Sequence, residues 1–220
     1  MSSFGVLFDM DGVLVDSNPT HKRMILDFCN AHGTSITEEF LQQHIYGRTN
    51  KEWIPIVFPD ASEEEVLALS DEKEQLFREQ FSPRDNMVPG LPDFLKDLSL
   101  NHIPLVLATS APAENADYIL KTLDIRHYFN HVLTMADVSR GKPDPDIYLK
   151  SADRIGFPPE KCIVIEDSIA GVASGVGAGC TVIGITTTHS PSELSGCSLI
   201  EPDFRNMDYQ ILSRMIHSTD

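Results

Sequence analysis

Five short apolar segments constrain the fold of this chain more than any other feature of its sequence. Each is continuously apolar rather than alternating, which is typical of strands buried on both faces of a sheet. Helical patterns lie between them, and strands that alternate with helices form parallel sheets. We therefore predict an α/β fold with a doubly wound, Rossmann-like parallel sheet. The expected strands are residues 4–8, 104–108, 131–134, 162–166 and 181–185.

The region from residue 17 to residue 83 breaks this alternation, because it contains no candidate strand. We predict that it forms an inserted, all-helical cap domain, and that residues 1–16 and 84–220 form the α/β core domain. Helical patterns in the insertion cover residues 18–32, 37–45, 50–57 and 60–81. Those in the core cover residues 89–100, 113–123, 146–156, 168–179 and about 207–217.

The acidic composition excludes some classes of partner. The chain carries 33 Asp and Glu residues against 17 Lys and Arg residues, a formal net charge of −16. Such a surface repels nucleic acid and anionic membranes, so we expect neither as a partner. No apolar run approaches ~20 residues, and no signal peptide is expected. The four cysteines lack metal-ligand spacing, which favours reduced thiols and a cytoplasmic location.

Polar side chains lie at or after the ends of four of the predicted strands. In chain order they are Asp9 and Asp11, Thr109 and Ser110, Lys142, and Glu166 and Asp167. Ligands of open parallel sheets bind beyond the carboxyl ends of the strands. A single aspartate at a strand end is more often a helix cap than a catalyst. The joint pattern nevertheless indicates one site.

The residue types in this pattern suit phosphate chemistry. Carboxylate oxygens bind Mg²⁺, and a cation would offset the repulsion between Asp9 and Asp11. An aspartate can attack phosphorus and form an aspartyl-phosphate. A second carboxyl two residues later can protonate the leaving oxygen and then activate water. Lysine and hydroxyl groups can hold the oxygens of the transferring phosphate.

Four motifs along the chain resemble those of the haloacid dehalogenase-like hydrolases, and the resemblance covers nearly the whole chain. They are "DMDGVLVDS", Thr109 in "VLATS", Lys142 in "GKPDPDIY", and "IEDSIAG" at residues 165–171. A helical cap inserted at this position resembles the branch that contains phosphoglycolate phosphatase, small-sugar phosphatases and beta-phosphoglucomutase. The resemblance implies a Mg²⁺-dependent enzyme that acts on a small phosphorylated metabolite.

The resemblance also implies a role for each matched residue. Asp9 would be the nucleophile and a metal ligand, and Asp11 the general acid/base, with its backbone carbonyl on the metal. Asp167 would be a metal ligand, with Glu166 beside it holding the metal shell. The phosphate would be bound by Thr109, Ser110 and Lys142.

Three features of the cap resemble the substrate-binding features of this branch. They are His21, Lys73, and the segment "YGRTN" with Gly47, Arg48 and Thr49. Each has a simpler interpretation. His21 could be a surface histidine, Lys73 a solvated lysine, and Arg48 the partner of acidic cap residues. Such a cap is expected to close over the site and to read the substrate.

The sequence favours a phosphatase that hydrolyses a sugar phosphate. The alternative is a phosphomutase, which must also bind a second, non-transferring phosphate. The mutase reads roughly G-V-S-R where this chain has "GRTN", so that Asn50 takes the place of the arginine. A remote alternative is a non-catalytic receiver-like module, but receiver domains are shorter and lack a cap. We expect a monomer or a weak homodimer.

Overall fold

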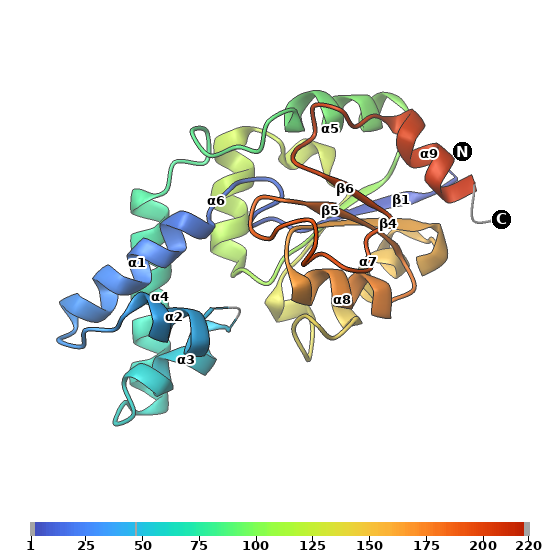
Figure 1. The fold of residues 1–220 in the computed structure, drawn as a ribbon. Coiled ribbons are helices and arrows are strands. Elements are labelled where there is room, and N and C mark those ends of the chain that lie inside the picture. Colours follow the sequence, from blue (N-terminus) through green and yellow to red (C-terminus); the bar gives the residue numbers. More distant parts are fainter. Residues whose placement is uncertain (1–2, 47, 218–220) are drawn as a thin grey trace. The chain divides into compact units, whose positions relative to one another are not determined.

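The computed structural model describes residues 3–46 and 48–217, and the chain forms two compact units. One unit consists of Met1–Asp16 and Pro83–Asp220 and is called the core unit below. The other consists of Ser17–Ser82 and is called the helical unit. Figure 1 draws the chain as a ribbon and labels most of its helices and strands.

The core unit contains a six-stranded, fully parallel sheet with the strand order β3-β2-β1-β4-β5-β6. The strands are β1 (Gly5–Phe8), β2 (Leu105–Ala108), β3 (His131–Leu133), β4 (Cys162–Glu166), β5 (Thr181–Ile185) and β6 (Leu199–Glu201). Phe8 is in register with Leu107 of β2 and with Ile165 of β4, so these three strands end at the same edge of the sheet. The sequence pattern missed β6, because three half-buried residues make no long apolar run.

Helices cover both faces of this sheet, as predicted for a doubly wound fold. In Figure 1, α5 and α9 lie on one face, and α7 and α8 lie on the other. Successive side chains of β1 point to opposite faces of the sheet. Leu7 packs in one cluster with Tyr148, whereas the Phe8 ring lies 6.1 Å from that of Phe94 on α5. The core helices are α5 (Leu91–Leu100), α6 (Ala113–Leu123), α7 (Asp146–Ile155), α8 (Ile169–Gly177) and α9 (Tyr209–His217).

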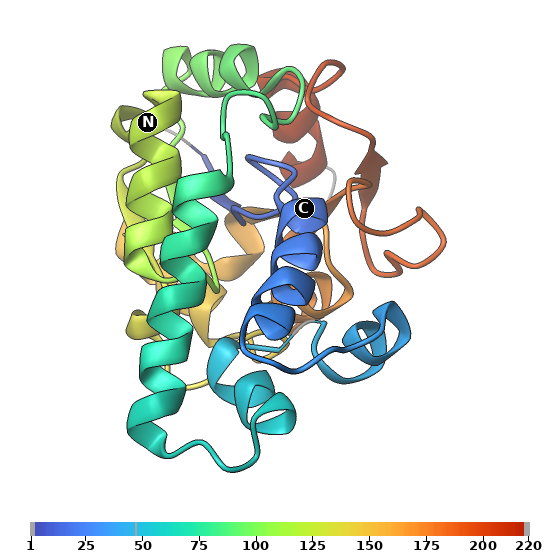
Figure 2. The same ribbon diagram turned by 90° about the vertical axis from the view of Figure 1, so that its left-hand side faces the viewer.

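The helical unit has no strand among its described residues. Its helices are α1 (Asn18–Ala31), α2 (Glu38–His44), α3 (Asn50–Val57) and α4 (Glu63–Gln80). Ser62 and Glu65 form a capping box at the start of α4, which satisfies backbone donors that would otherwise lack partners. Figure 2 shows α1 and α4 side by side. In the described ranges, no helix of either unit combines the length and the apolarity needed to cross a membrane.

Candidate active site

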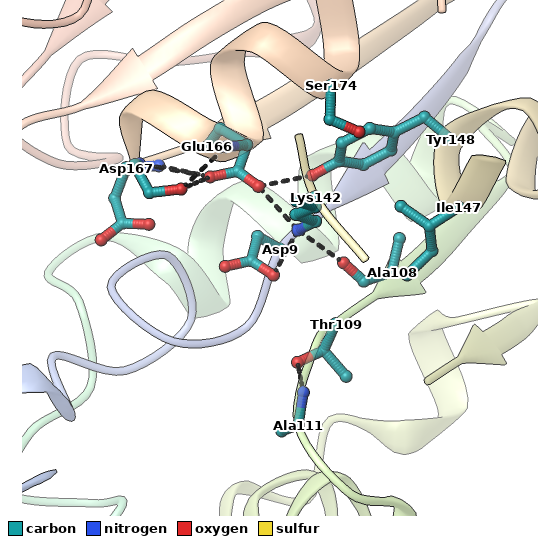
Figure 3. Close-up of polar contacts among 12 residues, drawn as sticks. Asp9, Ala108, Thr109, Ala111, Lys142, Ile147, Tyr148, Glu166, Asp167 and Ser174 are labelled. Atoms are coloured by element: carbon teal, nitrogen blue, oxygen red, sulfur yellow. Dashed lines mark hydrogen bonds and ion pairs between the residues drawn. The ribbon is translucent and has the colours of Figure 1, made fainter. Parts of the chain in front are cut away.

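The predicted site residues of the core unit gather at the carboxyl edge of three neighbouring strands (Figure 3). Asp9 follows β1, Thr109 follows β2, and Glu166 is the last residue of β4, with Asp167 next to it. Lys142 comes from the segment between β3 and α7. The shared register of the parallel strands therefore brings together side chains that lie far apart in the sequence.

The ammonium group of Lys142 is the centre of this cluster. Its Nζ atom donates hydrogen bonds to Oδ1 of Asp9 at 2.7 Å, to Oε1 of Glu166 at 2.6 Å, and to the carbonyl oxygen of Ala108 at 3.0 Å. The ring of Tyr148 lies 4.9 Å from the same nitrogen. Only 7% of the side chain is exposed. Burial by itself would lower the pKa of Lys142, but the carboxylates of Asp9 and Glu166 outweigh it and raise the pKa, which keeps the lysine charged.

Glu166 holds this lysine in place. Its Oε1 atom also accepts a hydrogen bond from the hydroxyl of Tyr148 at 2.7 Å. Its Oε2 atom accepts from the backbone nitrogens of Asp167 and Ser168 at 3.1 and 3.2 Å, and from the Ser168 hydroxyl at 3.0 Å. Burial would raise the pKa of Glu166, but Lys142 and these donors lower it. Glu166 is therefore a fixed anion that orients Lys142.

The remaining carboxylates of the cluster carry more negative charge than one lysine offsets. Burial, together with the charges of Glu166 and Asp11, raises the pKa of Asp9 to about 7 even though Lys142 opposes the change. Burial and the charges of Glu166 and Asp9 also raise the pKa of Asp167 well above its ordinary value. A site with this imbalance favours an additional cation.

The donor set fits a hard divalent cation. Asp9, Glu166 and Asp167 each offer a carboxylate oxygen, and these three oxygens lie within 4.8 Å of one another. All three residues are buried. Carboxylate oxygens are the ligands that Mg²⁺ prefers in proteins. Asp11 is half-buried in the turn that follows Asp9, and its role as a carbonyl ligand remains a prediction.

The two hydroxyl residues after β2 differ in exposure. Thr109 is buried, and its Oγ1 atom accepts a hydrogen bond from the backbone nitrogen of Ala111 at 3.0 Å. Ser110 is exposed. Figure 3 shows Thr109 at the end of its strand, near the backbone of Ala108 that Lys142 contacts. Their roles in phosphate binding remain predictions.

Two of the predicted cap residues contact each other within the helical unit. Nζ of Lys73 lies 3.2 Å from Nδ1 of His21 and donates to Oε1 of Glu74 at 2.7 Å. The imidazole of His21 stacks on the ring of Phe77, with 4.1 Å between centroids. Lys73 is only 4% exposed, so it is not the solvated lysine of the simpler interpretation.

The segment "YGRTN" is described in part. The Thr49 hydroxyl donates to Oε2 of Glu52 at 2.9 Å, and this pair forms the capping box of α3. Arg48 is exposed, and Gly47 lies outside the described residues. Thr49 therefore has a structural role as a helix cap, and substrate contacts of Gly47, Arg48 and Thr49 remain predictions.

The residues that the sequence analysis missed include Tyr148, Glu74 and Thr188. The Tyr148 hydroxyl donates to Oε1 of Glu166, Glu74 accepts from Lys73, and the Thr188 hydroxyl donates to Oδ2 of Asp167. Tyr148 lies within the "GKPDPDIY" motif, so its place in that motif was an available signal. Thr188 stands in a Ser/Thr-rich segment with no distinguishing pattern.

Comparison with known proteins gives a consistent assignment. The chain is 35% identical to "Phosphorylated carbohydrates phosphatase" of Thermotoga maritima over 179 residues, which cover 79% of this chain and 81% of that protein. It is 31% identical to "Hexitol phosphatase A" of Escherichia coli over 198 residues, 89% of each chain. A crystal structure of a HAD hydrolase of family IA, variant 3, from Entamoeba histolytica superposes with a TM-score of 0.89 at 29% identity. That match covers 97% of this chain and 99% of the other.

The family model of the haloacid dehalogenase-like hydrolases matches residues 5–179, which include all four motifs quoted above. Both compact units fall largely within that range. The fold, the motifs and the two relatives agree with this match. The chain belongs to the haloacid dehalogenase-like hydrolases.

Proposed function

We propose that this protein is a Mg²⁺-dependent phosphatase that hydrolyses a small phosphorylated metabolite, with a sugar phosphate as the favoured class. The observation that carries the proposal is the bonding of Lys142 to both Asp9 and Glu166 at the carboxyl edge of the sheet. The substrate class is supported by the two relatives, whose names specify phosphorylated carbohydrates and hexitols.

The first step requires an ionised nucleophile. Burial raises the pKa of Asp9 to about 7, and the Lys142 ammonium, 2.7 Å away, favours the ionised carboxylate. An oxygen of Asp9 attacks phosphorus, the bond from phosphorus to the leaving oxygen breaks, and an aspartyl-phosphate remains. Lys142 then offsets negative charge on the transferring group.

Asp11 accounts for the proton in both steps. It gives its proton to the leaving oxygen in the first step, which releases the alcohol. It then accepts a proton from the water that attacks the aspartyl-phosphate, which releases phosphate and restores Asp9. Asp11 lies in the turn directly after Asp9 and is half-buried, so it remains accessible to substrate and to water.

The metal would be held chiefly by Asp9 and Asp167, with Glu166 bordering the site. Both oxygens of Glu166 already accept hydrogen bonds, so its main role is to orient Lys142. When bound, Mg²⁺ supplies positive charge that stabilises the phosphate oxygens and offsets the repulsion among the carboxylates.

The proposal is tested by a phosphate-release screen over sugar phosphates, phosphoglycolate and nucleotides, with and without Mg²⁺. Asp9→Asn should abolish release, and Asp11→Asn should slow it by roughly 100-fold or more, the usual contribution of general acid–base catalysis. Asp117→Asn, at an exposed position on α6, is the matched control and should leave turnover unchanged. Activity of the Asp9→Asn variant would refute the role of Asp9 as the nucleophile. Stable phosphorylation of Asp9 in the original protein, without turnover, would indicate a binding module.

A phosphomutase is the second candidate, because His21 and Lys73, which contact each other, both fit the mutase-like pattern. Sugar phosphatases of the same branch share these two residues, so the pair does not by itself separate the candidates. Asn50 argues for the hydrolase. Its amide nitrogen donates to Glu74 at 2.7 Å, and its amide oxygen accepts from the Trp53 indole at 3.0 Å. The Asn50 amide thus has structural partners and carries no charge for a second phosphate. Glu74 also neutralises Lys73.

The two candidates differ in their products. A hydrolase releases inorganic phosphate from beta-glucose 1-phosphate, whereas a mutase converts it to glucose 6-phosphate. We expect phosphate release without accumulation of glucose 6-phosphate. Conversion in excess of phosphate release would overturn the choice.

A further inference from the structure

The loop that follows β5 reads "TTTHS" at residues 186–190. It reaches the metal side of the candidate site, which is formed by Asp167 and by the turn from Asp9 to Gly12. Strand β5 pairs with β4, with Gly184 in register with Glu166. On its other side, the backbone nitrogen of Thr186 donates to the carbonyl oxygen of Glu201 at 3.1 Å. Pairing with β4 on one side and with β6 on the other therefore fixes where the loop begins. The chain leaves β5 next to the segment that carries Asp167.

Two hydroxyls of this loop contact the two segments that form the metal side. Oγ1 of Thr188 donates to Oδ2 of Asp167, and Oγ1 of Thr187 donates to the carbonyl oxygen of Gly12 at 2.5 Å. These partners are separated by 21 and 175 positions along the chain. Hydroxyls of Ser/Thr-rich loops usually bond to the backbone a few residues away. The long separations show that this loop instead connects distant segments.

Gly12 and Asp167 also contact each other closely. Gly12 has a φ of +76°, and a Cβ atom at this position would lie 1.9 Å from Oδ2 of Asp167. The Asp167 carboxylate therefore packs on the Gly12 backbone, and the same oxygen accepts the Thr188 hydrogen bond. The Gly12 backbone covers one face of this carboxylate, and the hydrogen bond from Thr188 restricts rotation of the carboxylate. Only 2% of Asp167 is exposed, so water supplies little alternative solvation.

We propose that Thr188 is a positioning residue for the divalent cation, because it holds the Asp167 carboxylate in the orientation that faces Asp9. Thr187 holds the adjacent Gly12 turn through its hydrogen bond to the Gly12 carbonyl oxygen. The inference rests on the proposed function only in its choice of Mg²⁺ as the cation. Residues that orient metal ligands typically change metal affinity by roughly 10–100-fold when they are mutated.

Thr188→Val tests this inference, because valine keeps the branched shape of threonine and removes the hydroxyl. We expect the dissociation constant for Mg²⁺, measured by calorimetry on metal-free protein, to rise by roughly 10–100-fold. Thr188→Ser keeps the donor and should restore affinity to near the original value. Thr186→Val is the matched control, since Thr186 is half-buried in the same loop and its described contact to Glu201 is through the backbone.

Two further measurements separate positioning from general destabilisation. The Mg²⁺ concentration for half-maximal phosphate release should rise with the dissociation constant, while turnover at saturating Mg²⁺ stays within a few-fold. If Thr188→Val does not fold, Thr188→Ala is measured by the same criterion. A Mg²⁺ affinity for the hydroxyl-deleted variant within two-fold of Thr186→Val would overturn the inference, as would absence of Mg²⁺ binding to the original protein. Mg²⁺ binding without phosphate release from any substrate would refute the proposed function alone.

Discussion

Replacing Tyr148 with phenylalanine removes a single hydroxyl from the buried cluster and leaves the ring in place. That hydroxyl donates to Oε1 of Glu166 at 2.7 Å, and neither residue has exposed surface. Removing one donor from a buried charged acceptor costs about 1.5–3 kcal/mol. The phenylalanine ring can still lie over the Lys142 ammonium, so the cation–π contribution is retained. We therefore expect the free energy of unfolding of the core unit to fall by about 1.5–3 kcal/mol.

The assay is urea denaturation followed by far-UV circular dichroism. The single tryptophan, Trp53, lies in the helical unit, so its fluorescence would report on the wrong part of the chain. Ser151→Ala is the matched control. Ser151 is also fully buried on α7, but its hydroxyl donates at 2.7 Å to the Ile147 carbonyl, a neutral helical acceptor. Its loss should cost only about 0.5–1.5 kcal/mol.

A double-mutant cycle with Glu166→Gln isolates the interaction. If Tyr148 acts through Glu166, the two variants should couple by at least about 1 kcal/mol. The Tyr148→Phe variant should also stabilise the transition state less, because Lys142 is less well oriented. Its kcat/KM should fall by about tenfold for each 1.4 kcal/mol of transition-state stabilisation that is lost. A destabilisation no larger than that of Ser151→Ala, together with a coupling energy near zero, would refute this account of the cluster.

The other predictions concern the same site. Gly171→Ala should destabilise the core unit by about 1–3 kcal/mol in the same urea assay, because its Cβ would lie 1.8 Å from the carboxyl carbon of Glu166. Gly177→Ala, where the nearest atom is 3.7 Å away, should be neutral or stabilising, and equal effects would contradict the packing argument. Metal-free protein should lose thermal stability as the pH rises from about 4 to about 7, because the raised pKa values of Asp9 and Asp167 make the folded state bind more protons than the unfolded state. Asp9→Asn should flatten this slope, and an unchanged slope would exclude Asp9 as its source.

The sequence alone was sufficient for much of the fold and for the gathering of the predicted strand-end residues at one edge of the sheet. Five strands were predicted because runs such as residues 4–8 and 162–166 are continuously apolar, and such runs are buried on both faces. Asp9 and Glu166 stand at the ends of those runs. The rule that parallel strands end at one edge was therefore enough to place them together.

The contacts of Tyr148 and Thr188 needed the tertiary structure. Tyr148 reaches Glu166 because α7 packs on β1, β2 and β3, and a helical pattern in the sequence does not specify that packing. The sequence does not predict β6, because three residues are too few to show a hydrophobic pattern. In the helical unit, the pairing of Lys73 with its neighbour Glu74 depends on rotamers and burial rather than on helical spacing.

The sequence by itself determined the order of elements, the residues at the strand ends and the class of chemistry, because each depends on local pattern. The tertiary structure decided which atoms meet. The partners of Thr187 and Thr188 lie 175 and 21 positions away and are selected by the sheet register and by the turn at Gly12. It also decided the charge balance, because the raised pKa of Asp9 arises from burial among groups contributed by separate strands.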